Sequence, residues 1–361
     1  MSLPTLDDAR HLTEWAPPLG VVSVYLRLDP SDRGGAWRTE LHNGLSSVLD
    51  RGGLDHQAAA ALRATAERID ERFANHERGL SRGEIGFVEV AAKPGAERWW
   101  STHLAVDSAA TAAFDERPLV APLVCLLERG APRGVALLSA ERVRVLEWAP
   151  GHLEELHSWE LSVFSGDWRE RKAPRVVDPA HGQAVSSSGR DQFDSRLEEN
   201  RHRFLGECSR LAARLTSERG WRQLLLFGAA EHRRELCQGL PSPGLAVEAG
   251  DADLISEPPG SLEEPIAMVV ERLDAERDRE LTERVLDETR GGTRGTAGRQ
   301  ETEAAMVETR VECLVLDATR AGASESLVRS ALASGATVAA VAGAAAELLA
   351  PVEGVAALLR Y

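Results

Sequence analysis

A glycine and a glutamine three residues apart, Gly189 and Gln192, are the residues of this chain best suited to chemistry. They follow a run of serines. A glutamine amide on a glycine-hinged loop can position a water molecule, and a backbone N–H beside it can stabilise an oxyanion, which together serve ester hydrolysis. The same residues also fit a serine–glycine linker in which Gln192 occupies the first turn of a helix. The spacing alone leaves both interpretations open.

Other catalytic and ligand-binding patterns are missing from the sequence. It contains no Walker phosphate loop, no Gly-x-Gly-x-x-Gly after a predicted strand and no Gly-x-Ser-x-Gly nucleophile turn. No His-Glu-x-x-His or Cys-x-x-Cys occurs, and the ten histidines are scattered, so we expect neither a metal site nor a cofactor. The four cysteines lie far apart in apolar patterns and are expected to be buried free thiols.

A long amphipathic helix must carry the Gly-x-x-Gln pattern. Apolar side chains recur at three-, four- and seven-residue steps, which is one stripe of a helix: Phe193, Leu197, Phe204, Cys208, Leu211 and Leu215. The other face is basic and carries Arg190, Arg196, Arg201, His202 and Arg203. Gly220 ends the helix shortly before an apolar strand over 224–227. We therefore predict a loop over 165–192 that stands on a stalk helix over 190–219.

The net charge of −15 argues against a general nucleic-acid binder, because phosphate binding depends on accumulated Lys and Arg. One segment departs from this balance. Between Trp168 and Arg190, five basic residues face two acidic ones, a local charge of +3, and Arg171, Lys172 and Arg175 belong to this group. An acidic body with one basic arm can touch RNA locally, whereas a solvated loop on an acidic protein is the alternative.

The chain is long enough for two or three domains, each with its own core. No apolar run approaches the roughly 20 residues that span a bilayer. The first 15 residues hold three acidic side chains and no positively charged n-region, which argues against a signal peptide. We expect a cytoplasmic protein without a membrane segment.

Alternating strand and helix patterns predict an α/β fold with mixed sheets flanked by helices. A first α/β domain is expected over 1–132. The central domain, 133–268, combines a three-strand meander, the loop, the stalk helix and a strand–helix–strand unit with mainly parallel pairing. The last domain, 269–361, again alternates helix and strand.

Three boundaries depend on local signals. The apolar stretch 118–127 fits either a strand or a short helix. Ser261 is expected to cap a long helix that ends at Arg290, because serine is a favoured N-cap and two glutamates follow it. The glycine-rich stretch 291–298 is interpreted as a connection between two helices.

Several motifs then occur in a recognisable order: a strand meander (135–161), Gly-x-x-Gln, the pair Arg201-His202, an apolar strand closed by Gly228, a Gly-x-x-x-Thr/Glu helix (298–304) leading to a strand (311–317), and the terminus 354–361. This order resembles the superfamily of archaeal/eukaryotic class-one release factors and Pelota, and its bacterial branch in particular. The first domain resembles it only through 23–26.

The chain departs from the family pattern at the loop tip. It has no Gly-Gly-Gln; its Gly-x-x-Gln is closer to the variant of release-factor-like peptidyl-tRNA hydrolases, and Gln183 is an alternative tip. The helix from Gln192 to Arg201 is about one turn shorter than is usual in the family. The Asn-Ile-Lys-Ser element used for stop-codon reading is absent, so we expect no decoding of stop codons.

The resemblance implies a three-domain, release-factor/Pelota-like translation factor that enters the ribosomal A site. Gln192, with Gly189, would promote hydrolysis of the peptidyl-tRNA ester without metal or cofactor. Ribosomal RNA would be contacted by Arg190, Arg196, Arg201, His202, Arg203, Arg171, Lys172 and Arg175. The implied partners are the ribosome, through its RNA and the P-site tRNA, and a translational GTPase such as elongation factor Tu.

Two other interpretations stay open. A Balon-type hibernation or rescue factor would occupy the A site without chemistry, and the missing Gly-Gly-Gln and the acidic body favour it. A regulatory protein could keep the fold without binding ribosomes, which the net charge of −15 favours.

Overall fold

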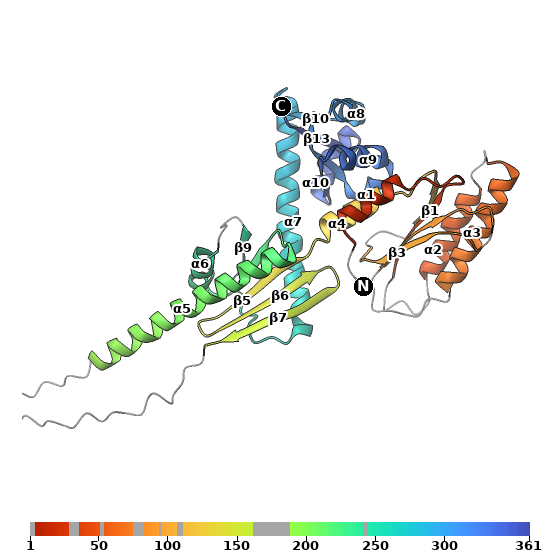
Figure 1. Ribbon diagram of the computed structural model, residues 1–361. Coiled ribbons are helices and arrows are strands. Elements are labelled where there is room, and N and C mark those ends of the chain that lie inside the picture. The colour runs from red at the N-terminus through yellow and green to blue at the C-terminus, as the bar shows by residue number, and fades with distance from the viewer. Residues whose placement is uncertain are drawn as a thin grey trace, which may run out of the picture. The chain divides into compact units, whose positions relative to one another are not determined.

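The computed structural model describes residues 4–28, 36–50, 54–74, 83–93, 95–106, 111–161, 188–240, 245–250 and 252–361, and of residues 188–197 it describes the backbone alone. The chain divides into two compact units (Figure 1): unit 1 comprises 1–131 and 270–361, and unit 2 comprises 132–269. Three sheets flanked by helices make the fold mixed α/β, as predicted. The division into three domains stays a prediction.

The first sheet of unit 1 is antiparallel, in the order β3-β2-β1-β4. Its strands are β1 (Val21–Arg27), β2 (Gly83–Glu89), β3 (Trp99–His103) and β4 (Thr111–Asp115). Alternation along β1 sends Val22 and Val24 to one face, where α2 (Ala36–Leu49) and α3 (His56–Ala74) cover them. Val21 and Tyr25 join the core on the other face, with α1 (Leu6–Glu14) and α4 (Ala121–Arg129).

The second sheet of unit 1 has the order β10-β13-β11-β12, in which only β11 and β12 are parallel. Its strands are β10 (Gly295–Ala297), β11 (Val311–Asp317), β12 (Thr337–Val341) and β13 (Val355–Leu359). The helical elements are α7 (Pro259–Arg290), α8 (Arg299–Val307), η3 (Ala318–Ser324), α9 (Glu325–Ser334), α10 (Ala344–Leu349) and η4 (Ala350–Val352).

At three boundaries the structure either decides between the alternatives that the sequence left open or differs from the expectation. The stretch 118–127 contributes to helix α4, not to a strand. Ser261 is not an N-cap, because α7 begins at Pro259 and runs through it; proline suits a first helical turn, where its missing N–H costs no bond. The connection 291–298 contains β10, whose three residues are too few for a periodic pattern to appear.

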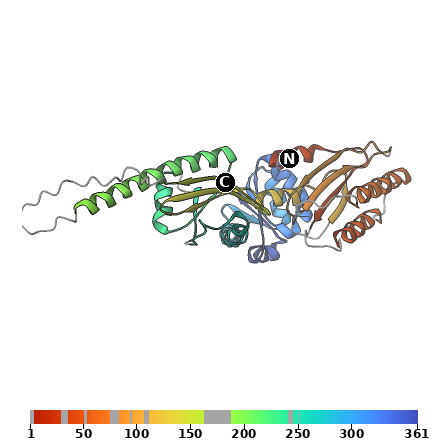
Figure 2. The ribbon, with the colours of Figure 1, turned by 90° about the horizontal axis from the view of Figure 1, so that it is seen from below.

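Unit 2 is a five-stranded sheet in the order β7-β6-β5-β8-β9. The meander β5 (Arg133–Leu138), β6 (Arg142–Ala149) and β7 (His152–Glu160) is antiparallel, and β8 (Leu224–Phe227) and β9 (Ala246–Gly250) extend β5 in parallel. The sheet is therefore mixed, and the strand–helix–strand unit β8–α6–β9 pairs in parallel, as expected. The stalk helix α5 (Ser188–Arg219) and the start of α7 lie on opposite faces of it (Figure 2), and α6 (Ala230–Gln238) packs against α5.

The four cysteines are free thiols, as predicted, but only Cys125 and Cys208 are buried; Cys237 and Cys313 are partly exposed. Among the described residues, no helix combines the length and the apolar character needed to cross a membrane.

Candidate functional site

The C-terminal end of α5 is fixed by a tryptophan. Gly220 takes a positive φ of 66°, which ends the helix in the left-handed region. Trp221 follows it into the core and donates its indole N–H to Oε2 of Glu147 on β6 at 2.8 Å. The ring lies so close to Gly134 on β5 that a Cβ there would be 2.3 Å from a ring carbon. Glycine at 134 therefore lets the stalk helix seat on the sheet.

The middle of α5 is held by the sheet and by α6. Leu205, Cys208 and Ala212 are buried in the core of unit 2. Ser209 donates its hydroxyl to the carbonyl of Leu236 on α6 at 2.8 Å. The C-terminal half of α5 is thus a packed element of unit 2, and its backbone continues without interruption to Ser188.

The Gly-x-x-Gln pattern lies inside α5. Because the helix begins at Ser188, Gly189 is its second residue and Gln192 its fifth. The expectation of a loop tip at 189–192 is therefore corrected: the backbone there is helical. Of the basic residues predicted to bind RNA, Arg190 and Arg196 belong to the same helix, whereas Arg171, Lys172 and Arg175, like the alternative tip Gln183, lie outside the described residues.

The predicted group Arg201, His202 and Arg203 does not form one surface. Arg201 is half-buried, and its Nε atom has no hydrogen-bond partner within the described part of the chain. His202 is bound across the helix pair, with its Nδ1 atom 2.5 Å from Oε1 of Glu235 on α6. Arg203 is exposed and lies 3.6 Å from Glu199 on the same helix. Of the three, Arg203 is the cation that is open to a ligand.

The outer face of α5 carries two arginines that the sequence interpretation missed. Arg210 follows Arg203 by seven residues and Arg214 follows by four more, a spacing that keeps all three on one helix face. Arg210 donates a hydrogen bond to the Gly206 carbonyl at 3.3 Å, and Arg214 pairs with Glu218 at 2.7 Å. The seven-residue recurrence of arginine was the signal that could have found them. We call Arg203, Arg210 and Arg214 the arginine stripe.

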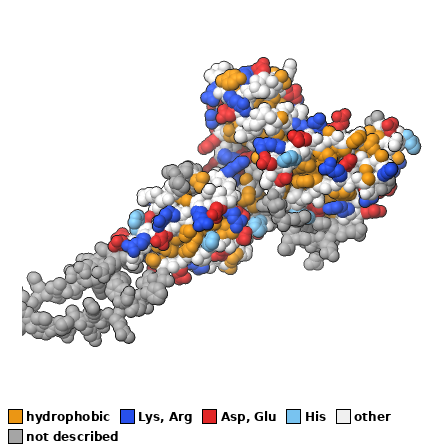
Figure 3. Space-filling model, viewed as in Figure 1, with side chains coloured by type: hydrophobic (Ala, Val, Ile, Leu, Met, Phe, Trp, Pro, Cys, Tyr) orange, Lys and Arg blue, Asp and Glu red, His pale blue; other side chains and the backbone are white. Residues whose placement is uncertain are grey.

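The stripe is not a strongly positive surface. The whole of α5 holds seven arginines and six carboxylates, a balance of +1. In Figure 3 basic and acidic side chains are interspersed over unit 2. Arg203 and Arg214 each form an exposed ion pair with a glutamate of the same helix, and such pairs contribute little to stability. Their guanidinium groups can therefore exchange a carboxylate for a phosphate at small cost.

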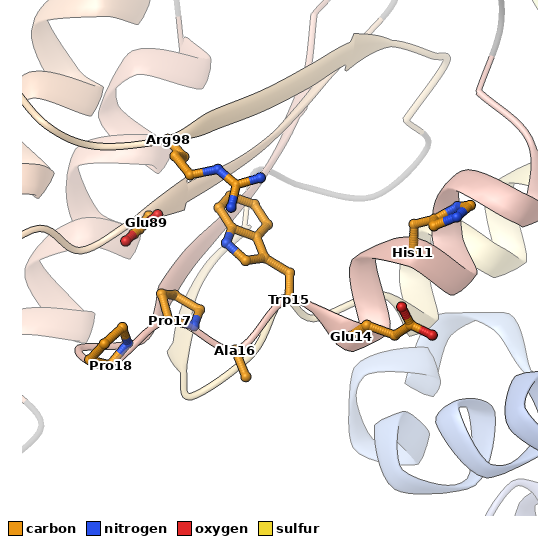
Figure 4. Close-up of a pocket in the computed structure, with 8 residues that line it drawn as sticks. All are labelled: His11, Glu14, Trp15, Ala16, Pro17, Pro18, Glu89 and Arg98. Atoms are coloured by element: carbon orange, nitrogen blue, oxygen red, sulfur yellow. The ribbon is translucent and has the colours of Figure 1, made fainter.

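Two hollows formed by the described residues contain no member of the arginine stripe. In unit 1 a hollow of about 450 Å³ lies beside α1 (Figure 4), where the Arg98 guanidinium is 5.3 Å from the ring centre of Trp15. In unit 2 a similar volume opens at the carboxyl ends of β5 and β8, where the Ser139 hydroxyl donates to the Arg142 carbonyl at 3.2 Å and His232 Nε2 lies 3.7 Å from Glu231 on the same helix. Neither hollow contains a residue that the sequence predicted to be catalytic or to bind RNA.

Comparison with known proteins gives a family for the central part of the chain. Residues 118–290 match the sequence profile of bacterial archaeo-eukaryotic release factor family 10. The match includes the meander, α5, α6 and all of α7. A comparison with curated protein sequences gives no match.

Solved structures of low sequence identity resemble the chain. They include the archaeal translation termination factor aRF1 (17% identity over 98% of this chain and 96% of that one, TM-score 0.26), Archaeoglobus fulgidus Pelota (15%, 100% and 94%, TM-score 0.35) and S. cerevisiae Dom34 (12%, 77% and 80%, TM-score 0.44). Because these TM-scores are low, the family rests on residues 118–290. Through that match, residues 118–290 are similar to the bacterial branch of the archaeo-eukaryotic release factors.

Proposed function

We propose that this protein is a ribosome-associated translation factor that occupies the A site without decoding a stop codon and meets ribosomal RNA through α5. The observation that carries the proposal is the release-factor match over 118–290, which includes α5, a helix of 32 residues packed on the sheet of unit 2. A translational GTPase such as elongation factor Tu is the partner we propose for its delivery.

The arginine stripe is the part of α5 that we assign to phosphate contacts. Its members are exposed, and a helix rise of 1.5 Å per residue spaces them about 10 Å and about 6 Å apart along the axis. Guanidinium groups bind phosphate oxygens through paired N–H donors. The near-neutral helix limits this to a local contact, which suits a protein of net charge −15.

The backbone at Gln192 favours ribosome binding without hydrolysis of peptidyl-tRNA over ribosome binding with hydrolysis. Only the first four N–H groups of a helix lack a partner in the helix, and the fifth residue donates to the carbonyl of the first. In a helix that begins at Ser188, the N–H of Gln192 is therefore not a free oxyanion donor. We accordingly propose a hibernation or rescue role for this conformation.

Co-sedimentation with vacant 70S ribosomes across a salt series tests the proposal. We expect binding by the wild type, and weaker binding with a shallower salt dependence for Arg210→Glu and Arg214→Glu, because each lost phosphate contact lowers the slope of log K against log salt by about one. Arg279→Glu is the matched control: Arg279 lies on α7, pairs with Glu283 at 2.7 Å and is as exposed as Arg214.

Two outcomes would contradict the proposal. Equal loss of binding for Arg214→Glu and Arg279→Glu would mean that the stripe is not the contact surface. If the wild type did not co-sediment with ribosomes at low salt, ribosome binding would be excluded.

A further inference from the structure

A histidine and two glutamates meet at the β6–β7 hairpin of unit 2. Glu147 on β6 stands directly opposite Glu154 on β7, and His152 lies two residues before Glu154, on the same face of that strand. Each of the three residues offers one ligand atom, and these three atoms all lie within 4.8 Å of one another. The His152 Nε2 atom is 3.9 Å from Glu154 Oε2. The sequence search missed this group because its donors come from two strands with irregular spacing.

We propose that Glu147, His152 and Glu154 bind a first-row divalent cation of the zinc class. Imidazole with two carboxylates is a donor set that such ions accept, and solvent would supply the remaining position. Zinc bonds of about 2.0–2.2 Å place tetrahedral ligand atoms about 3.3–3.6 Å apart. His152 and Glu154 are half-exposed, so side-chain rotation closes the difference without a backbone shift.

The third ligand is held in place by the structure. Glu147 is 12% exposed, and it accepts the Trp221 indole N–H on one oxygen while Arg219 lies 3.4 Å from the other. Each carboxylate oxygen has a second lone pair for a metal. Hydrogen bonds of this kind fix the orientation of a ligand carboxylate in metal sites.

The charge of this cluster also favours a bound cation. Two carboxylates directly opposite each other on neighbouring strands repel. Arg219 lies at Glu147 and offsets the charge of one of the two, so the two carboxylates and Arg219 together keep one negative charge. A divalent cation would replace the repulsion with two attractive contacts. It would also join the hairpin to the end of α5, because Glu147 is bonded to Trp221.

Calorimetric titration of the full-length protein with ZnCl₂ tests the site, with Co²⁺ absorption as a second measurement. We expect one site in the wild type, weakened at least about tenfold by His152→Ala and by Glu154→Gln. His157→Ala is the control: His157 is on the same strand but stacks on Trp159, 5.3 Å between ring centres, and stands outside the cluster. The Co²⁺ complex should lack a thiolate charge-transfer band, which separates the site from the partly exposed cysteines.

The proposal is overturned if the wild type binds no zinc, if His152→Ala and Glu154→Gln titrate like the wild type, or if His157→Ala loses as much affinity as they do. A thiolate band in the wild-type Co²⁺ spectrum would assign the metal to cysteine instead. None of these outcomes bears on ribosome binding, so the two proposals fail separately.

Discussion

The Glu325 carboxylate accepts the backbone N–H of Ala121 at 2.7 Å, although 204 residues separate the two. Its other oxygen accepts the N–H of Val120 at 3.1 Å and the Nε–H of Arg329 at 2.6 Å. Val120 is the N-cap of α4 and makes no cap with its own side chain. A residue at the start of α9 therefore caps α4 and joins the two sheets of unit 1, even though burial raises the pKa of Glu325 above its ordinary value.

Glu325→Ala should lower the free energy of unfolding by about 1–3 kcal/mol, because it leaves two partly buried N–H groups without acceptors. Glu325→Gln should cost less, since the amide oxygen still accepts one of them. Urea unfolding followed by circular dichroism measures both. Glu283→Ala serves as the control, because Glu283 also pairs with an arginine four residues away but is half-exposed and caps nothing. Equal effects at Glu325 and Glu283 would contradict the capping role.

A pair of glycine-to-alanine changes tests how α5 is seated. At Gly134 the added methyl would overlap the Trp221 ring, and we expect Gly134→Ala to destabilise unit 2 by about 1–3 kcal/mol. At Gly206, inside α5, a Cβ would meet nothing within 4 Å. Gly206→Ala should therefore stabilise the protein by about 0.5–1 kcal/mol, because alanine loses less conformational entropy in a helix. Thermal and urea unfolding of both variants would show opposite signs.

Periodic elements were the predictable part of the fold. The meander, α5 and β8 carry apolar patterns long enough to distinguish a strand from a helix, and the structure has them where the sequence places them. The stretch at 118–127 was ambiguous because α4 is apolar on most sides: it is packed between the two sheets of unit 1. Periodicity cannot distinguish a buried helix from a buried strand.

The candidate site was less predictable, because its arrangement depends on contacts distant in sequence. Nothing near His202 indicates that Glu235 on α6 will bind it. Likewise, Glu147 and His152 share no motif, since strand register brings them together. At 189–192, glycine and serine favoured a loop by local propensity, whereas the structure continues the helix of the following residues through them.

Thiol reactivity should separate the cysteines into two pairs. Burial raises the pKa of Cys125 and of Cys208 to about 12, so almost no thiolate forms on them at pH 8. We expect a thiol reagent such as DTNB to leave both unmodified in the native protein and to modify all four cysteines in urea. In the Cys237→Ser/Cys313→Ser variant the native protein should not react. Fast native reaction of that variant would show that the cores around α4 or α5 open readily.

The role of Gln192 is decided by comparing two activities of one variant. The backbone N–H of Gln192 occupies the position of a donor inside the helix. We therefore expect the Gln192→Ala variant to bind ribosomes like the wild type and to leave the rate of peptide release from P-site peptidyl-tRNA unchanged. Arg210→Glu, on the exposed face of the same helix, should instead weaken binding. Release at a catalysed rate by the wild type, lost at least about tenfold in Gln192→Ala with binding intact, would mean that this helix end unwinds on the ribosome and that the glutamine acts on the ester. Because binding and release are measured on the same ribosomes, a folding defect would lower both and cannot be mistaken for a catalytic one.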